Sequence, residues 1–264
     1  MGNHHAPVHR FIRPDQVGED VYTRVLGHLS EYPFLTVFHL KGCPAISPHI
    51  FRFLNGRDGP LFPALRDFFM DFILETADGK WFFNCDEDIL PWEHDFKLEW
   101  DGNGWDLYGD GPSSVLQTKW CECRMIPNPL VFTPFILSAA ETASQMKNLK
   151  KFTIIIPLDE IDFDVPQYFQ FWLLQAGIPH KEDFLSIPAD KSVRHLPRLY
   201  WRTTNWKPNE QELTAWKSVM GPDSVAYHLS EADMKDAPVP QKRTNYFGIA
   251  DWYPTIYEGI LEPL

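Results

Sequence analysis

The chain has little cysteine, and this scarcity excludes a small domain held together by disulfides. Its 264 residues include four cysteines, at positions 43, 85, 121 and 123, and no Asn-x-Ser/Thr glycosylation site. Secreted domains that depend on disulfides carry cysteine at a much higher density. Residues 1–5 also lack the basic and then apolar order of a secretion signal. We therefore expect a reduced, intracellular protein of the cytoplasm or nucleus.

Positive charge and long apolar runs are also scarce, which excludes two classes of partner. The chain has 24 Lys and Arg against 36 Asp and Glu, a formal net charge of −12. Binding a phosphate backbone or an anionic bilayer usually requires a basic patch, and small clusters such as Lys147, Lys150 and Lys151 do not provide one. The apolar run at residues 152–156 ends at Pro157, far short of a membrane-spanning helix. We predict no nucleic-acid partner and no membrane partner.

Common catalytic and metal-binding motifs are missing as well. The chain has no Gly-rich phosphate loop, no Gly-x-Ser-x-Gly turn and no His-Glu-x-x-His helix. Cys121 and Cys123, even with His94, lack the second ligand pair of a structural zinc site. In the acidic loop from Asp101, Trp105 occupies a calcium-ligand position, so a hairpin turn explains that loop better. We predict no metal and no cofactor, which leaves a cofactor-free cyclase or isomerase open.

What the chain does contain is a short phrase, Leu-x-x-Phe-x-apolar, that occurs three times. Its copies begin at Leu35, Leu65 and Leu149, and a weaker copy without the phenylalanine begins at Leu196. The leading leucines are 30, 84 and 47 residues apart. Large apolar residues at these offsets suit leucine-rich-repeat strands, whose alternate side chains enter one shared core. The alternative is a set of unrelated buried strands that share the phrase by chance.

Helical patterns lie between these copies. Val21, Val25, Leu26 and Leu29 form one apolar stripe within residues 19–31. Further helices are predicted from the capping hydroxyl of Thr133 before Pro134, over 166–177, and from 208 or 209 to 217. The predicted strands lie within 35–40, 65–74, 149–156 and 199–203. This alternation predicts an α/β fold, an irregular leucine-rich-repeat-like right-handed solenoid with parallel strands on the concave face and helices outside.

We predict a single repeat-like domain over residues 1–264. The first two repeats, an insertion, the later repeats and an extended aromatic C-terminal tail occupy 19–74, 75–120, 121–220 and 221–264. The insertion holds ten Asp and Glu between Asp78 and Asp110. Alternation before the turn at 101–104 predicts an acidic, Trp-rich β-hairpin there.

Period two within the strands predicts one binding face. If Phe38, Phe68 and Phe152 enter the core, their odd-numbered neighbours point to the other side of the sheet. The candidate ligand-binding residues are Val37, His39, Lys41, Asp67, Phe69, Asp71, Lys151, Thr153, Ile155, Tyr200 and Arg202. In register, Val37 would lie beside Asp67, and Lys41 beside Asp71. Rings mixed with charges are typical of a ligand surface; the alternative is a solvated face with one weak ion pair.

Three residues of this face are candidate catalytic residues if the protein is an enzyme. A carboxylate of Asp67 or Asp71 close to His39 would raise the basicity of the imidazole and orient it for general acid–base catalysis. The alternative is that His39 is an ordinary surface residue of a strand.

Several short motifs occur in an order that carries a resemblance. They are Cys43-Pro44 with Ile46-Ser47, Phe62–Leu65, Asp78–Phe83, Met146–Leu149, Leu199–Trp201 and Trp206–Glu210. In this order they resemble the C-terminal region of fungal F-box proteins with irregular leucine-rich repeats, over about residues 20–220. The resemblance implies a recognition domain that binds a protein or small molecule. An F-box, the three-helix segment that docks a ubiquitin-ligase adaptor, does not fit in the first eighteen residues, so no adaptor-binding residues are carried over.

Three functions follow from these observations. The first is a recognition domain without enzymatic activity, whose concave strand face binds a protein or small molecule. The second is a cofactor-free cyclase or isomerase of a fungal secondary-metabolite pathway on the same scaffold. The third is a structural protein without a pocket.

Overall fold

The computed structural model describes residues 20–41, 44–85, 124–156, 169–180, 185–186, 190–203, 206–229, 242–244, 250–252, 255–256 and 262–263. Its helices are α1 (Val21–Leu29), α2 (Ile50–Asn55), α4 (Phe132–Gln145), α5 (Asp190–Val193) and α6 (Glu210–Met220). The strands of its main sheet are β1 (Val37–Leu40), β2 (Asp67–Asp71), β5 (Lys151–Ile156), β6 (Phe169–Leu174), β8 (Arg198–Arg202), β9 (Val225–Leu229) and β13 (Glu262–Pro263). Shorter strands are β3 (Phe83–Cys85), β4 (Arg124–Pro127), β7 (Leu185–Ser186), β10 (Lys242–Thr244), β11 (Ala250–Trp252) and β12 (Thr255–Ile256). The hairpin predicted near residues 101–104 lies outside the described residues.

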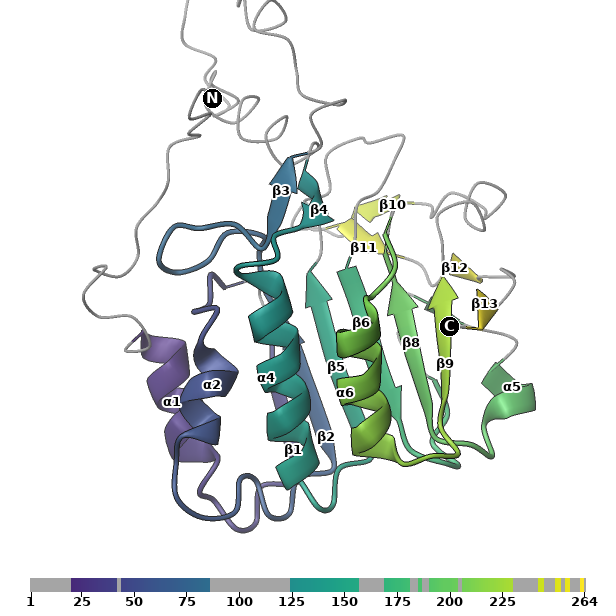
Figure 1. Cartoon of the computed structure of the whole chain (residues 1–264), viewed down its shortest axis with the longest axis horizontal. Coiled ribbons are helices and arrows are strands. Elements are labelled where there is room, and N and C mark those ends of the chain that lie inside the picture. The colour runs from purple at the N-terminus through teal and green to yellow at the C-terminus, as the bar shows by residue number, and fades with distance from the viewer. Residues whose placement is uncertain are drawn as a thin grey trace, which may run out of the picture.

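The main sheet is mostly parallel and carries its larger helices on one side. Its strand order is β1-β2-β5-β6-β8-β9-β13. The pairs β1–β2, β2–β5 and β8–β9 are parallel, whereas β6 is antiparallel to both of its neighbours and β13 to β9. Helices α1, α2, α4 and α6 lie side by side across one face of the sheet (Figure 1). The fold is therefore mixed α/β, as the sequence predicts.

The core is organised around a ladder of phenylalanines on the three parallel strands. Phe38 pairs in register with Phe68, and Phe68 with Phe152. Their ring centroids are 5.2 and 4.6 Å apart, and Phe68 and Phe152 are fully buried. Phe51 of α2 and Trp216 of α6 close over this ladder from the helix layer. The three copies of the phrase thus form equivalent positions of one sheet, as expected from their shared spacing.

Helix α1 forms as predicted, but its buried stripe is different. Leu26 is buried as expected, whereas Val21 is 62% and Val25 49% exposed. The face that packs consists of Thr23, Leu26, Gly27 and Ser30. A Cβ at Gly27 would lie 2.9 Å from Arg57 Nη1 and 3.0 Å from Phe53 Cε1, so glycine lets α1 lie close against these side chains without displacing them. Of the four residues predicted to form the stripe, Leu26 and the partly buried Leu29 therefore pack against the core, whereas Val21 and Val25 do not.

The helix predicted over residues 166–177 is wrong, because its apolar part is strand β6. All but one of the six residues of β6 are buried. A strand covered on both faces reads as a continuous apolar run, and such a run also satisfies a helical pattern. This strand also interrupts the parallel arrangement that the sequence predicts.

The start of α4 differs from the prediction in its cap. Thr133 lies inside the first turn and its hydroxyl donates to Glu212 Oε1 over 2.9 Å. Glu212 in turn closes a capping box with Asn209 at the start of α6. A buried carboxylate thus joins the first turns of two neighbouring helices.

We expect Asn209→Ala to lower the free energy of unfolding by about 1 kcal/mol, because the Glu212 N–H loses its cap acceptor. Urea unfolding measures this change. Ser218→Ala, which removes an exposed hydroxyl from the same helix, is the control and should change stability by less than about 0.5 kcal/mol. Equal effects of the two substitutions would contradict the role of the capping box.

Candidate functional site

The candidate site is on the face of the main sheet opposite α1, α2, α4 and α6, which we call the far face. Side chains alternate between the two faces of a strand, so the neighbours of the core-facing phenylalanines point to the far face. Its middle row runs across six strands in register, through His39, Phe69, Thr153, Trp172, Tyr200 and Tyr227. The sequence placed four of these six residues on one face.

The far face is open at the β1–β2 end, where charges surround a ring. Val37 pairs in register with Asp67, as predicted, and is 51% exposed. His39 Nε2 lies 3.4 Å from Asp67 Oδ1, and both side chains remain partly exposed. The imidazole meets the Phe69 ring edge-on with centroids 5.5 Å apart, and Lys41 Nζ lies 5.1 Å from the centroid of the same ring. An imidazole, a carboxylate and an ammonium are thus gathered within reach of one ligand.

The structure brings His39 to Asp67. Asp71 lies four residues after Asp67 in β2 and pairs in register with Ile155. Lys41 follows the last residue of β1. Of the three candidate catalytic residues, His39 and Asp67 therefore form the pair that the structure records as a contact.

The other end of the far face is covered, which corrects one expectation. Thr153 and Tyr200 are completely buried and Arg202 is 8% exposed, although period two alone predicted an open surface. Phe69, at the β1–β2 end, is also only 8% exposed, because His39 and Lys41 lie against its ring. The ring of His180 packs edge-on against Tyr200 and against Trp172, with centroids 5.7 and 4.9 Å apart. The chain after β6 therefore folds back over this end of the sheet, and a local pattern contains no sign of it.

The covering segment is held by an ionic network that sequence reasoning missed. Asp190, at the start of α5, accepts from Arg198 Nε over 2.5 Å, from Tyr200 over 3.0 Å and from the His180 N–H over 3.2 Å. Arg194 donates to the same carboxylate. Burial alone would raise the pKa of Asp190, but the hydrogen bonds from His180 and Arg198 outweigh it and the pKa is lowered. Burial and the nearby Asp190 carboxylate raise the pKa of Tyr200.

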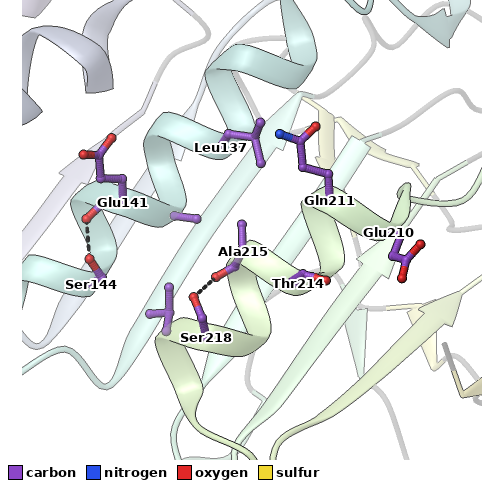
Figure 2. Close-up of a pocket in the computed structure, with 10 residues that line it drawn as sticks. Leu137, Glu141, Ser144, Glu210, Gln211, Thr214, Ala215 and Ser218 are labelled. Carbon is purple, nitrogen blue, oxygen red and sulfur yellow. Dashed lines mark hydrogen bonds between the residues drawn. The ribbon is translucent and has the colours of Figure 1, made fainter.

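The groove between α4 and α6 is a separate surface on the helix layer. It measures about 710 Å³ and is lined by Leu137, Ala140, Glu141, Ser144, Glu210, Gln211, Thr214, Ala215, Ser218 and Val219 (Figure 2). The hydroxyls of Ser144 and Ser218 donate to carbonyls of their own helices. This groove contains none of the predicted site residues.

The described residues show neither a metal-binding cluster nor a membrane-spanning helix. Within the part of the chain that the structure describes, no group of three or more His, Cys, Asp or Glu is placed to hold a metal ion. None of the helices described has the length and apolar character needed to cross a bilayer.

Comparison with known proteins gives no relative. No family model matches the chain, and neither a curated protein nor a solved structure does. The function must therefore be argued from the site itself.

Proposed function

We propose that this protein is a recognition domain that binds its ligand on the far face of the sheet. The observation that carries this proposal is the β1–β2 end of the register row, where the ring of Phe69 lies beside the partly exposed His39–Asp67 pair and Lys41. Aromatic rings between charged side chains do not make a surface more soluble, so solubility does not explain this arrangement. Ligand sites commonly combine apolar walls with a few placed polar groups.

We propose a repeat-like scaffold for this domain, as in the proteins that the sequence resembles. Five helices are each followed by a strand, in the pairs α1–β1, α2–β2, α4–β5, α5–β8 and α6–β9. These five strands all run in one direction, because β6 is antiparallel to both β5 and β8. A solenoid built from such units would present its strand face to a partner, which agrees with binding on the far face.

A second candidate function is a cofactor-free cyclase or isomerase. The observation that favours it is the 3.4 Å approach of His39 Nε2 to Asp67 Oδ1 beside an aromatic ring. A carboxylate at this position orients an imidazole for proton transfer. In an identified assay, His39→Ala and Asp67→Asn should then abolish turnover; full activity of either variant would exclude this function.

The recognition proposal is tested by capture of the natural ligand. Protein purified from its source is examined by native mass spectrometry for a bound metabolite or polypeptide. We expect His39→Ala and Asp67→Asn to lower occupancy about tenfold, because each removes a polar contact to the ligand. Stability should change by less than about 0.5 kcal/mol, because both side chains are partly exposed.

The control for the capture experiment lies on the other side of the molecule. Glu210→Gln changes a charge in the groove between α4 and α6 and should leave occupancy unchanged. Loss of ligand in this variant, or full occupancy in both far-face variants, would reject the far face as the binding surface.

A further inference from the structure

Two residues opposite one another at the centre of the far face each carry a buried polar atom. Thr153 of β5 and Trp172 of β6 are a register pair in adjacent antiparallel strands, 0% and 1% exposed. Among the residues that the structure describes, neither the Thr153 hydroxyl nor the Trp172 indole N–H has a hydrogen-bond partner. Both groups are buried and no protein group bonds them, which lowers folding stability unless another molecule supplies the bond.

Trp172 differs in its position from two other buried tryptophans whose indole N–H has no partner. The N–H groups of Trp201 and Trp216 are also buried without a partner. Trp201 and Trp216, however, both pack against Phe171 in the interior between the sheet and the helices. Of these three indoles, Trp172 alone has an unpaired hydroxyl as its register neighbour, and it alone belongs to the face on which we place the ligand.

The chemistry of the pair defines what it would bind. An indole N–H donates and cannot accept, so its partner must present an acceptor. Side chains directly opposite one another in an antiparallel pair have Cβ atoms about 4.5–5.5 Å apart. A carbonyl oxygen has two lone pairs, so a ligand carbonyl between the two side chains could accept from the indole and from the hydroxyl.

The surroundings favour an apolar ligand of small size. The middle row continues with the ring of Phe69 on one side of the pair and the ring of Tyr200 on the other. The ionic groups nearest to that end are already bonded to each other, since Asp190 accepts from both Arg198 and Tyr200. A protein surface docking on the sheet would need this row exposed, but the row is buried and the His180 ring packs edge-on against Trp172. A ligand at this pair would therefore have to be small and to displace that ring.

We propose that Thr153 and Trp172 together bind the carbonyl oxygen of a small, otherwise apolar and aromatic ligand. This inference rests on the proposed function, because it names the ligand class of the same face. It adds a carbonyl-binding pair, Thr153 and Trp172, which we call the carbonyl anchor, at the buried centre of the face. This anchor is distinct from the partly exposed His39–Asp67 pair.

The test compares two probes that differ in one atom position. Acetophenone has a carbonyl where α-methylstyrene has a methylene group. Both are titrated into full-length protein labelled with ¹⁵N-tryptophan, and the indole N–H signal of Trp172 is assigned by its loss in Trp172→Phe. We expect acetophenone to shift that signal and to bind about tenfold more tightly than α-methylstyrene.

Variants make the assignment specific. Thr153→Val keeps the shape of the side chain and should weaken acetophenone binding roughly fivefold without changing α-methylstyrene binding. Trp216→Phe, the control for an unpaired indole in the interior, should change neither. Equal affinities for the two probes, or an unmoved Trp172 signal, would overturn the proposal, and this is also the result expected if the pair holds only an internal water.

A third probe separates a small ligand from a polypeptide. N-acetyl-phenylalanine methylamide offers a peptide carbonyl, and a Trp172 shift with this probe but not with acetophenone would overturn the small-molecule class. The capture experiment gives the independent answer about the face itself. A natural ligand that depends on His39 and Asp67 but tolerates Thr153→Val would leave the recognition function standing and reject this anchor.

Discussion

Arg198→Met is expected to lower the free energy of unfolding by about 3–5 kcal/mol, because it leaves the buried carboxylate of Asp190 without its closest cation. Arg198 is completely buried and Asp190 is 1% exposed. The guanidinium also donates to the carbonyl of Ile178. Ile178 lies two residues before His180, whose ring packs on the far face. Urea unfolding followed by tryptophan fluorescence measures the change.

The same carboxylate supplies a matched control. Arg194 donates to Asp190 Oδ2 over 3.1 Å, but its side chain is 37% exposed. Solvent screening makes such a pair worth about 0–1 kcal/mol, so Arg194→Met should have a small effect. If the two arginine variants were equally stable, burial would not be what makes the Arg198 pair important.

The network also predicts a pH dependence. The pKa of Asp190 is lowered in the folded protein, so the stability that this group contributes is present above the unfolded value of about 3.9. This contribution is lost as the pH falls through the folded pKa. The difference in stability between the native protein and Arg198→Met should therefore shrink in acid, in unfolding curves recorded from neutral pH downward. A constant difference across that range would place the origin of the effect elsewhere.

The strand ladder could be predicted from sequence because its cause is local. A strand whose alternate residues enter one core must repeat with period two, and Phe38, Phe68 and Phe152 keep the same offset from a leading leucine. The period then fixed the opposite face as well, including the pairing of Val37 with Asp67. No knowledge of distant contacts was needed for either result.

The errors arose where distant contacts decide the structure. Strand β6 is apolar on both faces because the helix layer covers one face and the segment that carries His180 covers the other. Its sequence therefore satisfies a helical pattern as easily as an extended one. Asp190 and Arg198 are eight residues apart with no periodic relation, so their pairing across the far face has no signature in the chain.

The same distinction explains the candidate site. Sequence reasoning placed Thr153 and Tyr200 on the correct face but predicted them to be open, since it contained nothing about the covering segment. It missed Trp172 altogether, because that residue belonged to the misassigned helix. The proposed carbonyl anchor thus becomes visible only when the register of β5 and β6 is known.

Phe68→Ala is expected to destabilise the protein by about 3–5 kcal/mol, the usual cost of removing a buried phenylalanine side chain. Phe68 is fully buried at the centre of the ladder and stacks on Phe152 with an interplanar angle of 7°. It also contacts the rings of Phe38, Phe51 and Phe62. Removing it therefore opens a cavity between the sheet and α2 that stiff neighbouring rings cannot fill, and urea unfolding would report the loss.

The matched control makes the same chemical change at the surface. Phe34 is 87% exposed just before β1, so Phe34→Ala should alter stability by less than about 0.5 kcal/mol. The contrast tests the fold directly, because both phenylalanines belong to the same kind of short apolar segment in the sequence. A small effect of Phe68→Ala would mean that the ladder does not form the core, and the far face would then lose the register on which the proposed binding site depends.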